Sequence, residues 1–397
     1  MSMPRAVRHI NEIRVLEVVF RAGKVSRANI ARELGLTRST ASSLVAGLAD
    51  EGLLLEDTSG EDKGAGTGRP GTFLRLNPKH GLFLGADIGV GHITIIALDF
   101  AGSIIANRNF QFETDRKDFE KLTSQLARCV SKVVRSIGPG YILRGLSVIV
   151  PGVIDRSGTV LRAPFLGWRR VPLLERMSAL LPEMPVVVAE NDANAFALAD
   201  GYRSQIDQND TSIYILLDAG VGGAVVTSGQ LLRGHDGYAG EFGHIILGEQ
   251  GFVELATPSG SFESFVGHDA VLARHRHYGG TCKTVDALMK AAQNAEPAAL
   301  KTIKDWSFYL GRGLALISSI FNPSRIVLGG RVAALYHLCV EHTQLNIRGN
   351  LLDDHPLPIV NLSRTGLEGP ALGGASMLHR QMFSVDKNLV FRIDLQT

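Results

Sequence analysis

Cationic and hydroxyl side chains cluster near the N-terminus in a pattern that suits contact with phosphate groups and base edges. The stretch RSTASS begins at Arg38, and another arginine, Arg27, lies shortly before it. Arginine binds phosphate oxygens and guanine edges, whereas small hydroxyl side chains let a helix approach a groove of DNA closely. We therefore predict DNA contacts from Arg27, Thr37, Arg38, Ser39, Thr40, Ser42 and Ser43.

The distribution of charge points to the same segment. Residues 1–49 contain eight Lys or Arg against three acidic residues, a formal charge of +5, although the whole chain carries only +2. A segment that binds DNA leaves such an electrostatic footprint because it neutralises phosphates. The contact with nucleic acid is therefore expected at the N-terminus.

Short helices joined by a tight turn are expected to position these side chains. Apolar residues recur at helical spacing over residues 10–20, and Gly23 ends that stretch. Ser26 and Thr37 are predicted N-caps of two further helices. The last of the three would enter the major groove with its N-terminus first, and its inward-facing positions would be Ala41, Leu44, Val45 and Leu48.

A winged hairpin is predicted to follow the helices. The segments LLLED and TFLRL read as strands, and the glycine-rich segment between them carries Gly68-Arg69-Pro70. We predict that Arg69 enters the minor groove, whose width an arginine senses. The alternative is an ordinary small helical domain in which Arg38 and Arg69 are merely solvated, or contact phosphate without reading bases.

Composition sets the class of the whole chain. Its 397 residues, 45% of them hydrophobic, can bury a large core and suggest two or three domains. No apolar run is long enough to span a membrane and no secretory leader is visible, so we expect a cytoplasmic protein without a membrane partner. The three cysteines, Cys129, Cys282 and Cys339, are far apart and are expected to be packing residues.

From Leu82 onward, buried strands alternate with glycine-rich turns, which predicts an α/β fold rich in parallel strands. The segments LFLGADI, LSVIV and VVVAE read as strands, SIYILLDAGVGGAVVTSG reads as a hairpin around a glycine turn, and NDANAFALADG reads as a helix. Further along, RIVLGG reads as a strand that ends in glycines before another helix.

Five motifs of this region occur in a specific order: LGADIG, VPGVID, ENDANA, GYAGEFGH and NPSRIVLGG. In these motifs the chain resembles the ROK family (repressors, open reading frames and kinases), and specifically its regulator branch with a fused DNA-binding domain. The resemblance implies a winged helix-turn-helix followed by a two-lobed, actin-like ATPase fold of the sugar-kinase-like type. We expect a DNA-binding domain over residues 1–80, one α/β lobe over 81–200 and a second over 201–397, with the C-terminal helix returning to the first lobe.

The resemblance also implies a hexose-type sugar between the lobes. By motif match, its polar contacts would come from Asn191, Asp192, Glu241, His244 and Glu263, and Gly152 would approach the ring by its backbone. Asp192 would be the general base if phosphoryl transfer occurs. The alternatives are that Asn191 and Asp192 only cap the following helix, and that His244 is an ordinary polar residue with satisfied hydrogen bonds.

Both turns that hold ATP phosphates in kinases of the family are altered here. The first turn, residues 87–92, has Val90 and His92 where Gly and Thr are expected, and the second has Asp218 close to where a phosphate would lie. A carboxylate at that place repels phosphate unless a metal ion intervenes. ATP binding is therefore not expected, although Asp87 is retained and residual nucleotide binding stays open.

The zinc site of the family is altered as well. Counting from His244, its three cysteine positions are filled by Glu254, Ala256 and Ser261. A tetrahedral zinc site needs four suitable ligands, so we predict neither structural zinc nor any other cofactor. The loop over residues 248–260 should instead be held by packing of its apolar residues, Phe252, Val253 and Leu255.

The leading interpretation is a transcriptional regulator, expected to be a repressor of sugar metabolism or transport genes and not an enzyme. A sugar would bias closure of the lobes, and the change would reach the winged helix through the segment near residues 70–85. The alternatives are an active ATP-dependent sugar kinase with an attached DNA-binding domain, and a DNA-binding protein whose sensor only dimerises. A homodimer or higher homo-oligomer on an inverted-repeat operator is expected, because one winged helix covers only a half-site.

Overall fold

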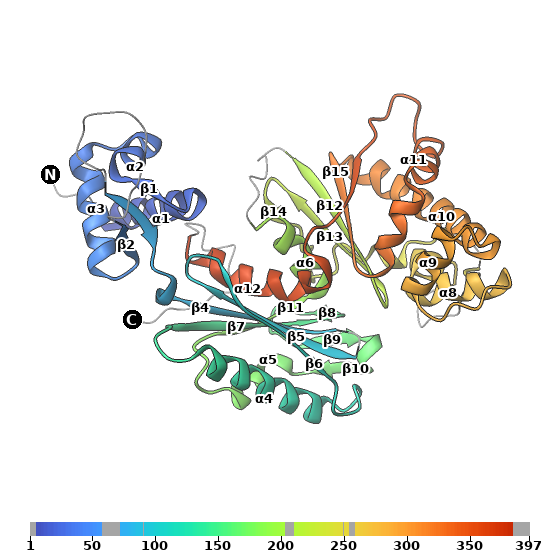
Figure 1. The fold of residues 1–397 in the computed structure, drawn as a ribbon, viewed down its shortest axis with the longest axis horizontal. Helices are drawn as coiled ribbons and strands as arrows, with labels where there is room; N and C mark the ends of the chain where they lie inside the picture. The colour runs from blue at the N-terminus through green and yellow to red at the C-terminus, as the bar shows by residue number, and fades with distance from the viewer. Residues whose placement is uncertain are drawn as a thin grey trace.

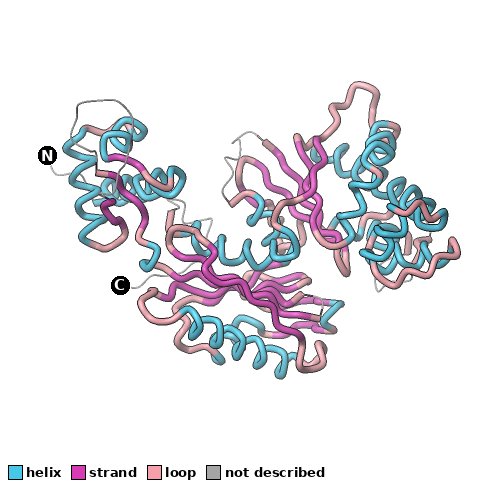
Figure 2. The backbone as a smooth tube through the Cα atoms, viewed as in Figure 1, coloured by secondary structure: helices cyan, strands magenta, loops and turns pink. Residues whose placement is uncertain are grey.

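The computed structural model describes residues 5–57, 72–89, 91–202, 210–248, 250–253 and 259–383. They form a small N-terminal domain and two α/β lobes, which follow one another along the chain from blue to red in Figure 1. The tube in Figure 2 shows a sheet in each lobe, with helices against both.

The N-terminal domain contains the three predicted helices and the two strands of the wing. Its elements are α1 (Arg5–Ala22), β1 (Val25–Ser26), α2 (Arg27–Leu34), α3 (Arg38–Asp50), β2 (Leu54–Asp57) and β3 (Phe73–Leu76), and the strands form a sheet in the order β1-β3-β2. Residues 58–71, which include the predicted wing contact Arg69, lie outside the described residues.

The predicted helix starts and the buried face of α3 are confirmed. The Ser26 side chain accepts a hydrogen bond from the Asn29 amide and the Thr37 side chain accepts one from the Thr40 amide, as N-caps do. On α3 the four predicted inward residues are all buried. In α1, by contrast, Ile10 is 39% exposed, and Val15 and Val18 complete the buried face.

The first lobe is built on a five-stranded sheet in the order β11-β7-β4-β5-β6. Helices α4 and α5 lie against one face of this sheet and the C-terminal helix α12 against the other (Figure 1). A three-stranded flap, in the order β10-β9-β8, follows β7. The bounds are β4 (Leu82–Ile88), β5 (His92–Asp99), β6 (Ile104–Gln111), α4 (Phe119–Ile137), β7 (Leu143–Val150), β8 (Val153–Ile154), β9 (Val160–Ala163), β10 (Trp168–Val171), α5 (Leu173–Leu180) and β11 (Val187–Asn191), with 3-10 helices η1 (Pro78–His80) and η2 (Pro164–Leu166).

The second lobe has a five-stranded sheet in the order β14-β13-β12-β15-β16, and its helices gather at the far end of the molecule in Figure 1. Its strands are β12 (Thr211–Leu217), β13 (Val221–Thr227), β14 (Gln230–Leu231), β15 (Arg325–Gly329) and β16 (Ile359–Leu362). Its helices are α7 (Phe262–Val266), α8 (His268–His277), α9 (Val285–Gln293), α10 (Pro297–Phe321) and α11 (Val340–Arg348), with 3-10 helices η3 (Phe242–His244), η4 (Val332–Leu338) and η5 (Gly366–Glu368).

The two sheets share one topology. In each, the first strand pairs with an antiparallel hairpin partner on one side and with a parallel strand on the other. Each sheet therefore has two parallel and two antiparallel ladders. The hairpin predicted around the glycine turn after β12 is confirmed. The expected excess of parallel strands is wrong, because the turn after β4 also closes a hairpin instead of leading into a crossover helix.

A pair of helices lies between the sheets: α6 (Asp192–Asp200) follows the last strand of the first sheet, and α12 (Gly369–Gln381) follows the last strand of the second. They pack against each other, and α12 also packs against β4 and β7. The approach is close, because a Cβ at Gly85 would lie 1.9 Å from the carbonyl oxygen of Ala371 and one at Gly373 would lie 1.7 Å from that of Ala195. No side chain fits at either glycine.

The apolar cores of the two lobes contain two of the three cysteines. Cys129 and Cys339 are buried, which confirms their packing role, whereas Cys282 is half-buried. In the second lobe, Trp306 and Leu310 of α10 are fully buried and belong to the same apolar cluster as Ile213 and Ile326 of the sheet. Within the described part of the chain, none of the helices combines the length and apolarity needed to cross a bilayer.

Candidate functional site

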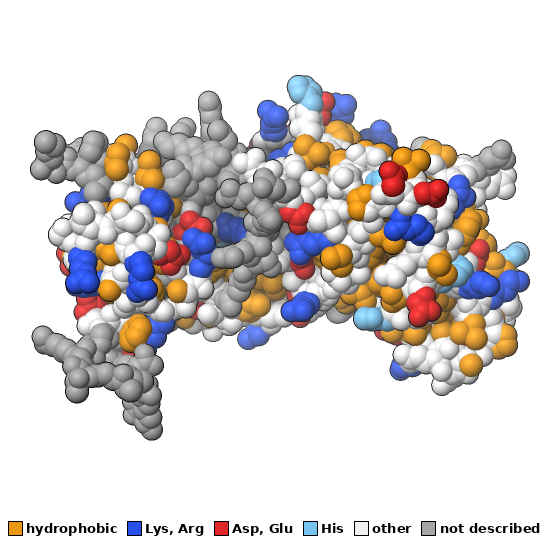
Figure 3. Space-filling view, turned by 90° about the horizontal axis from the view of Figure 1, so that it is seen from above, with side chains coloured by type: hydrophobic (Ala, Val, Ile, Leu, Met, Phe, Trp, Pro, Cys, Tyr) orange, Lys and Arg blue, Asp and Glu red, His pale blue; other side chains and the backbone are white. Residues whose placement is uncertain are grey.

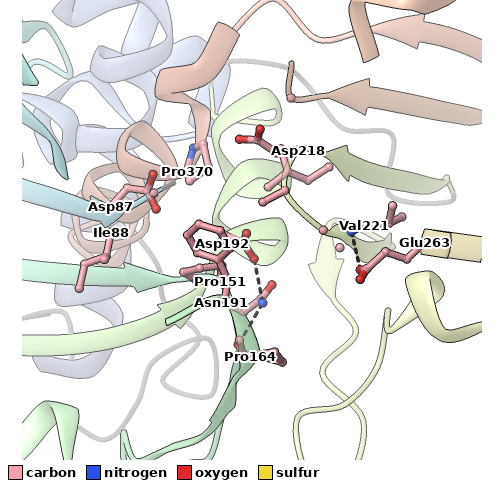
Figure 4. Close-up of a pocket in the computed structure, with 18 of the residues that line it drawn as sticks. Asp87, Ile88, Pro151, Pro164, Asn191, Asp192, Asp218, Val221, Glu263 and Pro370 are labelled. Atoms are coloured by element: carbon pink, nitrogen blue, oxygen red, sulfur yellow. Dashed lines mark hydrogen bonds between the residues drawn. The ribbon is translucent and has the colours of Figure 1, made fainter. Parts of the chain in front are cut away.

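A cavity of about 320 Å³ opens between the two lobes and brings together all six residues predicted to bind sugar. They come from four separate places: the turn after β7, the junction of β11 and α6, the segment around η3, and α7. Figure 4 shows labelled side chains approaching the cavity from both lobes. The six are Gly152, Asn191, Asp192, Glu241, His244 and Glu263.

Asn191 caps a helix and lines the cavity at once. Its side-chain oxygen accepts a hydrogen bond from the Asn194 amide at 3.1 Å, while its nitrogen donates to the Gly152 carbonyl at 3.1 Å and to Asp192 Oδ1 at 3.0 Å. Helix capping and a position in the cavity wall, weighed as alternatives from the sequence, are therefore both realised. A Cβ at Gly152 would lie 2.5 Å from the Arg162 carbonyl oxygen, so only backbone fits there.

The carboxyl group of Asp192 has a pKa close to neutral pH. Burial raises its pKa from 3.8 to about 7, the Ala193 amide opposes that rise by a hydrogen bond of 2.9 Å, and the nearby charges of Asp218 and Glu241 add to it. A carboxyl group with such a pKa can accept a hydrogen bond or a proton from a ligand hydroxyl at neutral pH. Its place in the cavity suits sugar binding and leaves proton abstraction chemically feasible.

The opposite wall of the cavity contributes two glutamates and a histidine. Glu263 Oε2 accepts a hydrogen bond from the Val221 amide at 2.9 Å, drawn as a dashed line in Figure 4. Glu241 Oε2 lies 3.4 Å from His244 Nε2. Burial raises the pKa of both glutamates. Convergent acceptors with a histidine beside them suit the hydroxyl groups of a polyol ring.

The end of the cavity formed by the two altered turns carries the side chains of Asp218, Arg331 and His92. Asp218 Oδ1 lies 3.5 Å from Arg331 Nε, and His92 also lines the cavity there. Burial, followed by the charges of Asp192 and Asp218, raises the pKa of Asp87 well above its ordinary value. Val90, the other altered residue of the first turn, lies outside the described residues.

Arg331 is a cavity residue that the sequence analysis missed. It directly follows the glycine pair that ends β15, and β15 is parallel to β12 in register, with Leu216 opposite Gly329. The carboxyl ends of both strands therefore open on the same edge, where Asp218 follows β12. The position of Arg331, just beyond the glycine pair, is the sequence signal from which its contact with Asp218 could have been predicted.

Phe252, which precedes the altered zinc positions, packs against an arginine of α8. The guanidinium carbon of Arg274 lies 4.1 Å from the ring centroid of Phe252, and its Nε donates to Asp305 Oδ2 at 2.7 Å. The predicted packing role of Phe252 agrees with its place against the core of the second lobe. Ser261 is buried before α7, whereas Glu254, Leu255 and Ala256 lie outside the described residues.

The N-terminal domain presents most of the predicted DNA contacts on or beside the start of α3. Arg38, Ser39 and Ser43 are exposed, as is Thr37, whose hydroxyl lies 3.0 Å from that of Ser39. The remaining predicted residues of the helix, Thr40 and Ser42, are half-buried. Arg27 forms an ion pair with Glu56 on β2, which links α2 to the wing.

Comparison with known proteins matches both parts of this architecture. The family model described as ROK family covers residues 83–381, and the model described as IclR helix-turn-helix domain covers residues 13–58. A xylose repressor from Caldicellulosiruptor bescii is 28% identical over 396 residues, 95% of this chain and 97% of its own length. A glucokinase from Halalkalibacterium halodurans is 27% identical and covers 77% of this chain and 97% of its own length.

Solved structures show the same fold. A ROK family transcriptional regulator homologous to the Mlc protein of E. coli superimposes with a TM-score of 0.77 at 22% identity, over 95% of this chain and 97% of its own. A ROK family glucokinase from Streptomyces griseus, in complex with glucose and AMPPNP, has a TM-score of 0.65 at 25% identity, over 75% of this chain and 99% of its own. The chain therefore belongs to the ROK family and carries a helix-turn-helix domain ahead of its two-lobed, sugar-kinase-like part.

Proposed function

We propose that this protein is a DNA-binding repressor whose affinity for its operator is controlled by a sugar bound between the lobes. The observation that carries the proposal is the convergence of six polar or backbone groups from four segments in one cavity, in a chain that also presents an exposed α3. The xylose repressors among its relatives match nearly the full length, including the N-terminal domain. An aldose such as D-xylose is therefore the first effector to test.

Phosphoryl transfer is the second candidate, because Asp192 lines the cavity with a pKa of about 7, as a general base requires. Three features oppose it. Asp218 places a carboxylate in the second turn, its contact with Arg331 engages the cation that could otherwise attract a phosphate, and the bulky His92 lines the cavity at the first turn. We therefore propose that the chain is not a kinase and needs neither ATP nor zinc for its function.

The proposed binding residues can be tested by calorimetry with a panel of D-xylose, D-glucose, N-acetyl-D-glucosamine and myo-inositol. We expect one of these to bind the wild-type chain, and Glu241→Gln to weaken that binding about tenfold or more, as loss of a hydrogen bond to a charged group does. Asp236→Asn is the matched control, since the Asp236 side chain is 75% exposed. The proposed site is contradicted if none of the four compounds binds, or if the two substitutions change the binding affinity equally.

The kinase alternative has its own test. Purified chain is incubated with ATP and each sugar of the panel, and ADP release is measured. No turnover is expected. Turnover that disappears in Asp192→Asn would establish the kinase reading and refute the proposal that the chain is only a regulator.

We also propose that the protein acts as a dimer formed through its second lobe. Four large apolar side chains of α10 are exposed, and Leu345 on the adjacent α11 is 70% exposed. Figure 3 shows hydrophobic side chains gathered over the end of the molecule that contains this lobe. An exposed apolar patch of this kind marks an interaction site. The exposed apolar residues of α10 are Leu300, Phe308, Leu316 and Ile320.

A further inference from the structure

The two helices between the lobes both begin at the cavity. Asn191 and Asp192 at the start of α6 line it, and so does Pro370 in the first turn of α12, together with Gly366 and Leu367 just before that helix. Figure 4 shows Asp192 and Pro370 at the cavity together. A ligand that draws the lobes together therefore acts on the N-terminal ends of both helices.

These helices are placed to move as one body. The backbones touch at Gly373 and Ala195, so no side chain separates them. Besides α12, α6 contacts β11 and β7 of the first lobe and β12 and β13 of the second, and it thus lies where a change of lobe angle is felt. A helix of 13 residues is about 20 Å long at 1.5 Å per residue, so α12 carries a shift at the cavity to a distant surface.

The far ends of both helices meet α1 of the N-terminal domain. Tyr202, two residues beyond α6, and His379 in the last turn of α12 are joined by a hydrogen bond of 2.8 Å. The ring of Phe20 lies 5.7 Å from that of Tyr202 and 5.0 Å from that of His379, measured between centroids. It also stacks on Phe383 at 5.1 Å.

From Phe20 the contact continues to the helix that presents the predicted DNA contacts. Phe20 lies near the end of α1, and α1 packs on α2, β3 and α3. Val19 of α1 and Leu44 of α3 belong to the same apolar cluster as Tyr202, Phe100 and Phe383. The cluster therefore runs without interruption from the C-terminal end of the helix pair into the DNA-binding domain.

The covalent route, through β3, η1 and β4, also links the domain to the cavity. All seven residues of β4 are buried, and the strand is held between β5 and β7 at the centre of the sheet. A central strand of this kind gives little room for independent movement, whereas α6 and α12 lie at the boundary between the lobes. The helix pair is the better placed of the two to respond to closure.

We infer that α6 and α12 transmit sugar binding to the DNA-binding domain through the contact of Phe20 with Tyr202, His379 and Phe383. The inference rests on the proposed function and names the element that couples its two sites. Coupling requires that the sugar favour one arrangement of the lobes, and it is measured as the ratio of DNA dissociation constants with and without sugar. Phe20 and Tyr202 are positioning residues, since neither touches the cavity or the predicted DNA-facing surface.

The experiment uses the full chain, the sugars of the panel above, and a DNA duplex enriched from a random library by the wild-type protein. Phe20→Leu removes the ring but keeps an apolar side chain, and Tyr202→Phe removes only the hydroxyl bonded to His379. Phe110→Leu is the matched control, because Phe110 is a half-buried phenylalanine on β6 that packs in a different core cluster. Sugar affinity, DNA affinity and thermal stability are measured for each variant.

In the wild type, sugar is expected to change DNA affinity by a factor on the order of 5 to 150. In Phe20→Leu that factor should fall to within about twofold of 1, and Tyr202→Phe should reduce it, while each ligand alone binds within about threefold of wild type. Phe110→Leu should keep the full factor. Full coupling in both test variants overturns the inference, whereas a wild-type chain whose DNA affinity ignores every sugar of the panel overturns the proposed function itself.

Discussion

Asp192 is at once the first residue of α6 and a wall of the cavity, and the two positions have opposite demands. As a helix N-terminal residue it is favoured when ionised, because its oxygen accepts a hydrogen bond from the Ala193 amide. As a buried group near Asp218 and Glu241 it is favoured when neutral, and its pKa is raised to about 7. Asp192 therefore lowers the stability of the folded chain at neutral pH, and we expect it to be kept for its role in ligand binding.

This conflict predicts a pH-dependent gain of stability in Asp192→Asn. Because the pKa is higher in the folded chain than in the unfolded chain, where it is near 3.8, wild-type stability falls as pH rises from about 4 to about 7. Asparagine cannot ionise and keeps the acceptor oxygen. The variant should gain on the order of 4 kcal/mol over the wild type at pH 8 and little at pH 4, because each unit of the pKa difference corresponds to about 1.4 kcal/mol.

Thermal or urea unfolding at both pH values measures this gain, and calorimetry on the same samples should show weaker sugar binding. The exposed Asp236→Asn serves as control and should change stability by the same small amount at either pH. A gain at pH 8 no larger than that at pH 4 contradicts the assigned pKa.

Arg274 is the other residue whose burial predicts a large effect. Its side chain is fully buried, and besides pairing with Asp305 it donates to the Phe265 carbonyl at 2.9 Å. Arg274→Met keeps the apolar length but removes the cation that pairs with Asp305, which then retains only the hydrogen bond from the Tyr278 hydroxyl. We expect a loss of about 3 kcal/mol in the free energy of unfolding.

Urea denaturation measures this loss, and hydrogen exchange should report faster exchange in residues 250–253, since Phe252 loses the guanidinium against its ring. Arg276→Met is the matched control on the same helix, because Arg276 is exposed. Equal stability of the two variants would show that Arg274 does not anchor this segment.

At the scale of elements, α3 owes its role to what it leaves exposed. Its buried residues fix it to α1 and α2, and its N-terminus presents Arg38, Ser39 and Ser43 to solvent. Arg38 is expected to contact phosphate, whereas Arg27 is already engaged by Glu56. Among the predicted DNA contacts, Arg38 is therefore the most informative residue to substitute.

Arg38→Ala should weaken binding to the enriched duplex about tenfold and lower the slope of log affinity against log salt by about 1. Arg135→Ala, an exposed arginine on α4, is the control and should leave both quantities unchanged. Fluorescence anisotropy over a series of salt concentrations gives both. An unchanged salt slope in Arg38→Ala would contradict the prediction that Arg38 contacts a phosphate.

The elements that could be predicted from sequence are those with a local signal. Ser26 and Thr37 mark helix starts because their hydroxyls cap the next turn, and the glycine turns of LGADIG and LLDAGVGG mark the ends of strands. The six residues expected together from the motif order also line one cavity. Each of these features depends on residues that are neighbours in sequence.

What could not be predicted depends on contacts between distant segments. The pairing of Asp218 with Arg331 requires knowing that β12 and β15 are neighbours, and the junction of Phe20 with His379 joins residues from opposite ends of the chain. The hairpin of β12 and β13 was predicted from its glycine turn. The antiparallel pairing of β4, β5 and β6 was not predicted, because a buried parallel strand and a buried hairpin strand have the same apolar pattern. The hydrophobic periodicity of a strand does not show which other strand it pairs with.

At the scale of the whole molecule, the repeated sheet topology explains why one cavity can act on one DNA-binding domain. Each sheet ends in a helix that returns to the boundary between the lobes, so the two central helices, α6 and α12, meet there. The cavity lies at their N-terminal ends and the DNA-binding domain at their C-terminal ends. Closure of the lobes and movement of the domain thus share a common element.

One DNA-binding domain covers only a short half-site, so tight and specific binding needs a second copy held at a fixed spacing. The exposed apolar side chains of α10 offer the surface for that copy, and Ile320 is the most exposed of them at 63%. Ile320→Asp should dissociate the dimer in sedimentation experiments and weaken binding to an inverted repeat more than tenfold, because each monomer then contacts half of the phosphates. Stability of the monomer should not change, since the side chain is largely in solvent. Ile104→Asp is the matched control, being 51% exposed on β6 of the other lobe. A wild-type chain that sediments as a monomer at all concentrations, or a dimer that only Ile104→Asp disrupts, would move the interface away from α10 and require the two half-sites to be joined through another surface.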